Sequence, residues 1–524
     1  MSSLRWVFIR PRHESPYYDP EIQEPLGLEY LSASRREKGD AVLVLDALLE
    51  SMDDHRLARR AVSFRPDFIG ISIMTARELA SVQAIFAECQ KALAGREVCW
   101  LAGGNFISHE AERAIEALPD GFYLVRFEGE NALEVLARQW TARSPREACD
   151  KAPPSRIIVA APVADLQALP FPERPFACAL GSERGAFNIQ GSRGCLGACR
   201  YCSSPEARSL KGHQWRGRPM EHIVAEMDEL NRRYGAVAFN FIDEDFLGPN
   251  TLATERARQF AAGIERRGLS ISFSIQVRPD SLSREIIELL AASGLSYAFI
   301  GVESDNREDF KRWGRPWTGP PWDLVAHLRR LRVEVGAGVL LFHPHSTLQG
   351  IKGFAEVLHR HQMLNYRTAI NRLDAMPGSR FHQDGIAAGV LQPIAGPQRL
   401  PFVDAGLEAL YDQLTTALSP LGPVSMHAVC SLPAAVARHT LLRQSASAYQ
   451  ALKGIIGSLD GAVAETLFVL LGQHAAGKTG SHDIRELRLE NLAVSLAAAR
   501  ELVSLGMAPS VDQLREAIRM DAGI

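Results

Sequence analysis

Short apolar runs alternate with helical stretches along most of this 524-residue chain, and this alternation constrains the fold more than any other feature. In the first 140 residues, five runs rich in β-branched and aromatic residues are each followed by ten or more residues of helical pattern. The five runs are 5–9, 41–45, 67–73, 98–102 and 122–126. Because strands that alternate with helices pair in parallel, residues 1–140 are predicted to form a Rossmann-like, doubly wound α/β domain.

The rest of the chain divides into a linker, a second alternating block and a helical end. Residues 141–176 carry seven prolines, a density that opposes both helices and strand pairing, so this segment is predicted to be a linker on the surface. Residues 177–385 hold six further strand-like runs between helices, at 186–190, 236–242, 271–277, 297–302, 338–342 and 368–373. One intervening helix is expected to begin after Ser283 and to stop at Gly294. Residues 386–524 are predicted to form a helical C-terminal domain, because Ala and Leu recur there at helical spacing.

Three cysteines lie close together after the first run of the second block. Cys195, Cys199 and Cys202 have C-x3-C-x2-C spacing, which can hold three irons of a [4Fe-4S] cluster and leave the fourth iron open. Zinc is the alternative, but it prefers C-x2-C pairs and four ligands, and the sequence holds no second pair. The other cysteines are scattered and are expected to be buried thiols: Cys89, Cys99, Cys149, Cys178 and Cys430.

This cysteine spacing, with Tyr201 just before the last cysteine, resembles the signature of the radical S-adenosylmethionine (SAM) enzymes. The resemblance implies a partial (β/α)6 barrel over residues 177–385. It also implies that the open iron chelates the amino and carboxylate groups of SAM, and that one electron from the cluster cleaves SAM to a 5′-deoxyadenosyl radical. An electron donor such as flavodoxin or ferredoxin is then expected as a partner.

Polar residues at successive strand ends resemble the SAM-binding elements of that family. A D-x-x-F-like element follows the second run, where the family places the SAM amino group. An arginine at the end of the third run can pair with the SAM carboxylate, and the acid of a Gly-Val-Glu-Ser segment is placed to accept hydrogen bonds from ribose hydroxyls. Any one of these acids alone would more simply be a solvated loop charge. The expected SAM contacts are Tyr201, Asp243, Glu244, Gln276, Arg278, Glu303 and Ser304.

The residues that follow the strands of the first block resemble the cobalamin (B12)-binding domain that precedes the barrel in one branch of the family. Small residues there let the backbone approach a wide corrin ring, and serine and threonine hydroxyls can bond its amides. The D-x-H-x-x-G loop that gives a histidine to cobalt in one type of such domain is absent, so cobalt is expected to have no protein ligand or to face Arg77. The alternative is a domain that has lost its ligand. The expected cobalamin contacts are Leu26, Gly27, Ser72, Met74, Thr75, Arg77, Gly103, Gly104, Asn105, Glu128 and Gly129.

The composition gives no sign of a nucleic-acid or membrane partner. A net charge of -3 offers no electrostatic attraction for nucleic acid or an anionic membrane. The N-terminus lacks the apolar core of a signal peptide, and no run of eighteen apolar residues occurs. The protein is therefore expected to be cytoplasmic and to have no membrane span.

Together these expectations favour a cobalamin-dependent radical SAM methyltransferase that acts on an unactivated carbon of a small-molecule or peptide substrate. The alternative is a rearrangement or cyclisation, such as a ring contraction, without methyl transfer. A sensor without turnover has no use for an open iron, and methylthiolation needs a second three-cysteine cluster. The sequence identifies no catalytic residue, although His343 and His345 could face the substrate; two exposed loop histidines are the commoner case.

Overall fold

The computed structural model describes nine stretches of the chain, which divides into two compact units. The described residues are 3–12, 24–93, 95–142, 156–180, 186–203, 214–392, 396–425, 445–477 and 481–505. The first unit comprises Met1–Glu14, Ile22–Gly235 and Met376–Pro397, and the second comprises Ser15–Glu21, Ala236–Ala375 and Gln398–Ile524. The predicted domain boundaries at residues 140, 176 and 385 stay predictions.

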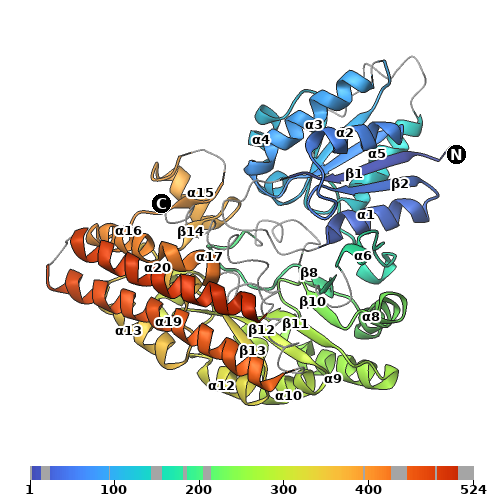
Figure 1. Ribbon diagram of the computed structural model, residues 1–524. Helices are drawn as coiled ribbons and strands as arrows, with labels where there is room; N and C mark the ends of the chain where they lie inside the picture. Colours follow the sequence, from blue (N-terminus) through green and yellow to red (C-terminus); the bar gives the residue numbers. More distant parts are fainter. Residues whose placement is uncertain are drawn as a thin grey trace. The chain divides into compact units, whose positions relative to one another are not determined.

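The first unit is built on a six-stranded parallel sheet with the order β2-β1-β3-β4-β5-β6, blue to cyan in Figure 1. The strands are β1 Arg5–Arg10, β2 Ala41–Asp46, β3 Phe68–Ser72, β4 Cys99–Gly103, β5 Phe122–Arg126 and β6 Ile157–Val159. The helices between them are α1 Leu26–Glu37, α2 Asp54–Ser63, α3 Leu79–Ala92, α4 Asn105–Ala117 and α5 Glu130–Ala142. The strand order reverses between β1 and β3, which is the point where ligands bind in sheets of this kind.

Helices cover both faces of this sheet. Successive side chains of a strand point to opposite faces, and in β1 Val7 and Ile9 join a core with residues of α2, α3 and α4. Trp6 and Phe8 instead join a core with residues of α1 and α5. The predicted doubly wound α/β fold is therefore confirmed.

The predicted surface linker is partly built into the first unit. β6 lies inside it and pairs in parallel with β5, because residues 157–159 hold no proline and can add an edge strand. The linker residue Arg174 is buried, and its guanidinium lies 2.6 Å from Glu24 and 2.7 Å from Glu226. The prediction of a segment lying on the surface is therefore wrong at Arg174, since two buried carboxylates require a buried cation, whereas Val159 of β6 is exposed.

Glu29 of α1 is a third acid buried near Arg174. Glu29 is fully buried, and among the described residues neither of its carboxylate oxygens has a hydrogen-bond partner. The Arg174 guanidinium lies 3.6 Å away. Burial raises the pKa of Glu29 to about 9, and the Glu24 charge adds to this shift while Arg174 opposes it. Glu29 is therefore neutral near pH 7.

The cysteine segment of the first unit is closed at its base by a short ribbon. After β7 (Phe187–Ile189), strand β8 (Ser192–Arg193) pairs antiparallel with β9 (Arg216–Gly217). Helix α8 (Met220–Tyr234) follows the ribbon. The two ends of the segment that carries the cysteines, here called the cysteine loop, are therefore held side by side.

The second unit carries a parallel sheet in which β10 pairs with β11, β11 with β12 and β12 with β13. Its strands are β10 Ala238–Phe241, β11 Ser272–Val277, β12 Leu295–Glu303 and β13 Glu334–Val339. The helices that alternate with them are α9 Asn250–Arg267, α10 Arg284–Ala292, α11 Arg307–Arg312 and α12 Trp322–Arg330, with α13 Leu348–Arg360 after β13. The predicted limits of α10 are confirmed, since the Ser283 hydroxyl accepts from the Ile286 amide and Gly294 follows the helix at a φ of 104°.

The last predicted run, 368–373, is not a strand of this sheet. Its first residues lie in α14 (Tyr366–Ile370), which begins with a capping box between Asn365 and Thr368. A single parallel bridge joins Phe342 to Arg372. The strand prediction is wrong because the reciprocal cap starts a helix where β-branched composition alone suggests a strand.

The C-terminal part of the second unit is helical, as predicted. Helix α16 (Gly406–Leu418) packs on both α19 (Ala446–Ala475) and α20 (Ser481–Ser504), which also pack on each other. One helix in the described part of the chain is long and apolar enough to cross a membrane, Ser447–Ala475, with a mean hydropathy of 1.6. It also lies against α13, and 44% of its most apolar stretch is buried inside the protein, so it is weak evidence for a span.

The cysteines outside the motif are not all buried. Cys89 and Cys99 are buried, as predicted, whereas Cys178 is exposed. The prediction is wrong for Cys178, which lies in the short helix α6 (Ala177–Leu180), because Ala177 and the preceding Phe176 take the buried positions. Cys149 and Cys430 lie outside the described residues.

Candidate functional site

The three motif cysteines lie on the loop that β8 and β9 close. All three are free thiols of intermediate exposure. A Cβ atom added to Gly197 would lie 3.4 Å from the sulfur of Cys195 and 3.6 Å from that of Cys199, so both sulfurs face this glycine. The Cys202 amide donates to the Cys199 carbonyl at 3.2 Å. Three partly exposed thiols on one turn, two of which face the same glycine, fit a cluster that is bound at three corners.

The described residues show no group of three Cys, His, Asp or Glu side chains that converges on a single metal ion. A single zinc ion needs its ligands at one point. A cubane cluster instead presents separate iron corners, so its three cysteine ligands need not converge.

The predicted SAM residues of the second unit follow β10, β11 and β12. After β10, Asp243 is buried and Glu244 is exposed, while Phe246 of the same segment packs edge-on against Phe241 at 4.7 Å. Gln276 is exposed on β11. Phe246 thus anchors a segment whose acids differ in exposure. The predicted SAM contact Tyr201 belongs to the first unit instead.

Arg278 already has protein partners. Its guanidinium donates to Asp245 at 3.0 Å, to Asn250 at 2.9 Å and to Asp280 at 3.1 Å. Burial raises the pKa of Asp245 to about 6 although the Arg278 charge opposes the shift. The sequence reasoning missed this role of Asp245. Arg278 joins the segments after β10 and β11, and its pairing with a SAM carboxylate stays a prediction.

Glu303 is held in an unusual backbone conformation at the end of β12. Its φ is +62°, which is rare for a residue other than glycine and is typical of functional or tightly constrained positions. Its carboxylate accepts from Arg315 at 2.6 Å, and Arg315 also donates to the Gly301 carbonyl at 2.8 Å. A Cβ atom on Gly301 would lie 2.7 Å from the Glu303 carboxylate, so a side chain at this position would displace the Glu303–Arg315 pair. No motif in the sequence marks Arg315 as the partner of Glu303.

Ser304 and His343 are brought together by Asp309 of α11. The Ser304 hydroxyl donates to Asp309 at 2.8 Å, and His343 Nε2 lies 3.3 Å from the same carboxylate oxygen. Burial raises the pKa of Asp309, but hydrogen bonds from His343 and Ser304 outweigh it and leave this pKa below its usual value. His343 is buried and His345 exposed, so the expectation of two exposed loop histidines is wrong for His343.

In the first unit, the predicted cobalamin residues after β3 are accessible. Ser72 is half-buried, Met74 is 49% exposed, and Thr75 and Arg77 are also exposed. The buried Glu78, which sequence reasoning missed, accepts from the amides of Met74 and Thr75 at 2.6 and 2.8 Å. Thr75 and Glu78 form a capping box, which the T-x-x-E spacing could have predicted.

Two glycines of the predicted cobalamin site differ in the space around them. Gly104, which precedes Asn105 at the start of α4, has a φ of +99°, and a Cβ atom there would lie 2.5 Å from the Ile73 carbonyl oxygen. This glycine is therefore required where the ends of β3 and β4 approach each other. Gly27, next to the buried Leu26, is exposed, and no described atom lies within 4 Å of its added Cβ. The space beside Gly27 and the exposed side chains after β3 fit a large flat ligand.

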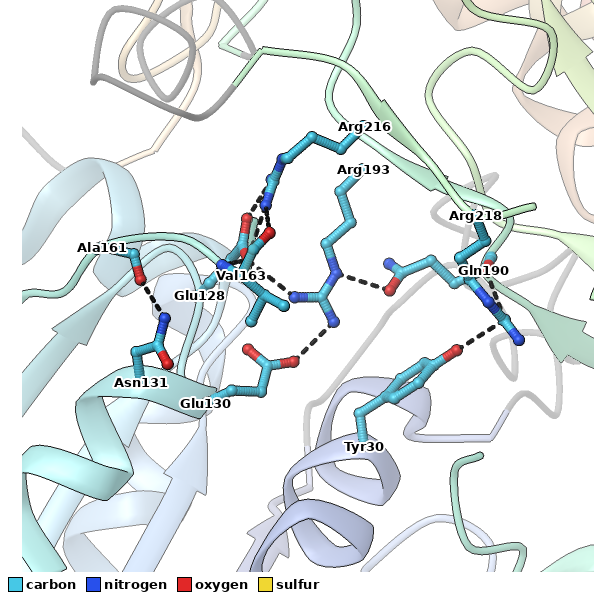
Figure 2. A network of polar contacts seen from close by, with 10 residues as sticks. All are labelled: Tyr30, Glu128, Glu130, Asn131, Ala161, Val163, Gln190, Arg193, Arg216 and Arg218. Atoms are coloured by element: carbon cyan, nitrogen blue, oxygen red, sulfur yellow. Dashed lines mark hydrogen bonds and ion pairs between the residues drawn. The ribbon is translucent and has the colours of Figure 1, made fainter. Parts of the chain in front are cut away.

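The remaining predicted cobalamin contacts after β4 and β5 lie close to other protein groups. A Cβ atom on Gly103 would lie 3.6 Å from the Val125 carbonyl, and one on Gly129 would lie 3.1 Å from Leu31. The carboxylate of Glu128 bonds the guanidinium groups of Arg193 and Arg216 (Figure 2). Glu128 therefore has protein partners, and its contact with cobalamin stays a prediction.

His55, in the first turn of α2, does not resemble a cobalt ligand. Asp53 caps α2 by accepting from the Arg56 amide at 2.7 Å. His55 is exposed, and its ring lies 3.3 Å from the Glu88 carboxylate. This arrangement agrees with the absence of the D-x-H-x-x-G loop from the sequence.

Two family models match the chain in the expected order. The model described as B12 binding domain matches residues 20–137, and the model described as Radical SAM superfamily matches residues 189–358. The first begins before α1, covers β2 to β5 and ends in α5, and the second begins before the cysteines and ends in α13.

Characterised and uncharacterised methyltransferases are among the relatives. An uncharacterized methyltransferase of Pyrococcus horikoshii is 26% identical over 295 residues, which are 53% of this chain and 61% of the relative. The hopanoid C-3 methylase of Methylococcus capsulatus is 26% identical over 349 residues, 63% of each chain. The chain thus spans about three-fifths of the length of these curated relatives.

Solved structures share the fold. The cobalamin-dependent SAM radical enzyme OxsB, with aqua-cobalamin and SAM bound, matches 99% of this chain and 84% of its own at a TM-score of 0.72 and 17% identity. The radical SAM methyltransferase TsrM of Kitasatospora setae, with cobalamin and a [4Fe-4S] cluster, matches 75% of this chain and 80% of its own at a TM-score of 0.59 and 17% identity. With a B12 binding domain followed by a radical SAM domain, the chain belongs to the cobalamin-binding radical SAM enzymes, whose cofactors are a [4Fe-4S] cluster, SAM and cobalamin.

Proposed function

We propose that this enzyme is a cobalamin-dependent radical SAM methyltransferase that methylates an unactivated carbon of a small-molecule or peptide substrate. The observation that carries the proposal is the succession of a B12 binding domain and a radical SAM domain in one chain. The names of the relatives from Pyrococcus horikoshii and Methylococcus capsulatus support methyl transfer. When bound, the cluster supplies the electron that cleaves SAM, and cobalamin carries the methyl group.

The residues of this chain bind and orient the cofactors. Cys195, Cys199 and Cys202 hold the cluster, and the accessible edge after β3 receives the corrin. Arg315 fixes the carboxylate of Glu303, which accepts hydrogen bonds from the SAM ribose. Because that carboxylate is held before SAM arrives, little side-chain entropy is lost when SAM binds.

A second candidate function is a rearrangement or cyclisation without methyl transfer. It is favoured by the likeness to OxsB, which extends over 99% of this chain. A related sequence is the 4′-phospho-dehydrooxetanocin synthase of Priestia megaterium, 26% identical over 196 residues, 33% of this chain and 26% of the relative. Neither name includes methyl transfer.

The experiment that separates the two functions measures the products of SAM. The reconstituted full-length enzyme is incubated without oxygen with methyl-deuterated SAM, a reductant and a metabolite extract. Methyl transfer gives 5′-deoxyadenosine and S-adenosylhomocysteine in a ratio near one to one, and a product that carries the deuterated methyl group. Formation of 5′-deoxyadenosine with essentially no S-adenosylhomocysteine would support the second candidate instead.

A further inference from the structure

The ribbon that closes the cysteine loop places two arginines directly opposite each other. Arg193 of β8 and Arg216 of β9 are register partners in this antiparallel pair. Like charges in opposed positions destabilise a ladder. Their side chains are only 11% and 13% exposed, so water screens the repulsion poorly. A ribbon of two residue pairs needs a counter-ion to stay closed.

Glu128 provides this counter-ion, as Figure 2 shows. Its carboxylate accepts from Arg193 at 3.0 Å and from Arg216 at 3.2 Å, and the second nitrogen of Arg216 also bonds it. The Val163 amide donates to the same carboxylate at 2.9 Å. Burial raises the pKa of Glu128, but the hydrogen bond from Arg216 and the charge of Arg193 outweigh it and leave the pKa below its usual value. The carboxylate therefore stays charged between the two cations.

The backbone before Glu128 is held in a conformation that directs the Glu128 side chain to the β8–β9 ribbon. Phe127 has a φ of +64°, which costs energy for a residue other than glycine. The Phe127 amide donates to the Ser108 hydroxyl of α4 at 3.0 Å, which helps to hold this conformation. Glu130, at the start of α5, adds a second contact to Arg193 at 2.7 Å. The segment after β5 is thus shaped to present two carboxylates to one ribbon.

The contacts join two parts of the chain that are far apart in sequence. Glu128 lies at the carboxyl end of β5, in the part of the chain matched by the B12 binding domain. Arg193 lies two residues before Cys195, the first cysteine of the loop. Arg193 also lies over the ring of Tyr30 in α1, at 5.7 Å from the ring centre. The base of the cysteine loop is therefore fastened to the ligand-binding edge of the first sheet.

We propose that Glu128 is a positioning residue that keeps the β8–β9 ribbon closed and thereby fixes the cysteine loop at this edge. This inference rests on the proposed function, in which SAM and cobalamin must react at one place. Without the counter-ion, the two arginines repel each other and the loop carrying Cys195 gains freedom. A displacement of about 1 Å at a reacting centre can lower a rate about 100-fold.

The test compares Glu128→Gln with Glu134→Gln in the full-length chain reconstituted with iron, sulfide and hydroxocobalamin. Glu134 is a matched control, because it lies on α5 and also bonds two arginines, Arg35 and Arg138, away from the ribbon. In Glu128→Gln, iron and cobalamin contents are expected to stay near those of the wild type. The EPR signal of the reduced cluster with SAM should broaden, and 5′-deoxyadenosine formation should fall at least about tenfold. Glu134→Gln should stay within about twofold on both measures.

A double variant tests the physical cause. Glu128→Gln/Arg216→Gln removes one of the two opposed charges, so it is expected to recover part of the narrow EPR signal and of the SAM cleavage rate. A double variant that is as impaired as Glu128→Gln, or more so, would overturn the counter-ion explanation. Glu128→Asp keeps the charge but has a shorter side chain, so its EPR line width and SAM cleavage rate should lie between those of the wild type and Glu128→Gln. It takes the place of Glu128→Gln in the test if that variant does not fold.

Other outcomes also decide the question. If Glu128→Gln loses cobalamin while its cluster signal is unchanged, Glu128 is a cobalamin contact and the inference is wrong. Equal losses in Glu128→Gln and Glu134→Gln would assign Glu128 a general role in stability. If the wild-type chain binds no cobalamin, the proposed function fails, but the EPR comparison with SAM still tests the positioning role.

Discussion

The ligand-binding edges of the two parallel sheets present their predicted contacts in different ways. In the first unit the segment after β3 offers exposed side chains such as Met74 and Arg77, and the start of α1 offers the open Gly27. In the second unit the residues after β11 and β12 are already bonded to the protein, Arg278 to Asp245 and Glu303 to Arg315. A wide ring needs access to the backbone, whereas a small zwitterion needs polar groups held in fixed orientation. These parts of the two predicted sites therefore differ, with open surface after β3 and at Gly27 and internal ion pairs after β11 and β12.

The largest effect is expected at the cysteine loop. Replacing Cys195, Cys199 and Cys202 with alanine should abolish iron binding and SAM cleavage, because these thiols are the predicted ligands of the cluster. Iron analysis and 5′-deoxyadenosine formation measure the loss. Cys178→Ala, at an exposed cysteine outside the motif, should keep both properties. Four irons per chain in the triple variant would contradict the assignment.

The ion pairs of the second edge are tested at Arg315. Arg315→Met leaves the carboxylate of Glu303 without its 2.6 Å partner at a site that is 9% exposed. Breaking a buried pair on one side costs about 3 kcal/mol of unfolding free energy. We expect a loss of that order in urea unfolding and weaker SAM binding in equilibrium dialysis. Wild-type stability in this variant would show that Glu303 does not depend on Arg315.

The close approach of β3 and β4 at the first edge is tested at Gly104. Gly104→Ala places a Cβ atom 2.5 Å from the Ile73 carbonyl at a φ of +99°. The strained backbone and the contact together should lower the unfolding free energy by about 2 kcal/mol. Thermal unfolding of the variant against the wild type measures the change. No decrease in stability would mean that the strand ends can separate without cost.

The first unit also contains Glu29, a buried acid whose pKa is raised by burial, and a pH series tests its protonation. The pKa of Glu29 is about 9 when folded and near 4.5 when unfolded, so the folded state holds more protons between these values. Stability due to Glu29 is therefore lost as the pH rises through this window, by about 1.4 kcal/mol per unit. Glu29→Gln mimics the neutral acid, so it should gain stability relative to the wild type between pH 6 and pH 8.

The control for this pH dependence is Glu134→Gln. The pKa of Glu134 lies below its usual value, because hydrogen bonds from Arg138 and Arg35 outweigh the effect of burial. Its titration window therefore ends below pH 6, and its stability curve should run parallel to that of the wild type between pH 6 and pH 8. If the curve of Glu29→Gln is also parallel, then Glu29 is charged in the folded protein.

The smallest effect is expected at Gly27, where the test is whether the corrin occupies the open space beside this residue. Gly27→Ala adds a methyl group that meets no described protein atom within 4 Å, and alanine favours the helix over glycine by about 0.5 to 1 kcal/mol. The variant should be as stable as the wild type or slightly more so. If the corrin approaches this position, the affinity for hydroxocobalamin should fall about fivefold, a loss of about 1 kcal/mol. Unchanged affinity would move the corrin away from Gly27.

Local signals in the sequence predict much of the fold and the type of each site. Five strands of the first sheet follow from apolar runs, and Ser283 and Gly294 mark the limits of α10 correctly. The run at 368–373 fails because Thr368 completes a cap with Asn365, and side-chain hydrogen bonding then outweighs strand composition. The sequence thus predicts the local structure of a segment where its composition and its side-chain hydrogen bonds favour the same element.

The partners of the motif residues could not be predicted, because each comes from elsewhere in the chain. Glu128 meets Arg193 and Arg216 across 65 and 88 positions of sequence. Arg174 is buried between acids although it lies in a proline-rich segment. Charged residues are usually exposed, so their type alone gives no sign of a buried pairing. Only the folded structure identifies which arginine pairs with which acid.

The cysteine loop is held at more than one place, and this sets the condition for exchanging it between enzymes. Its ends are joined at Ser192–Gly217 and Arg193–Arg216. Within it, the Arg200 carbonyl accepts from the Phe381 amide at 3.0 Å and the Arg200 guanidinium donates to Asp384 at 2.8 Å. A loop transplanted from a related enzyme must therefore keep both the arginines that meet Glu128 and the contacts of Arg200. With these contacts kept, engineering could change the surroundings of the predicted cluster and leave the first sheet untouched.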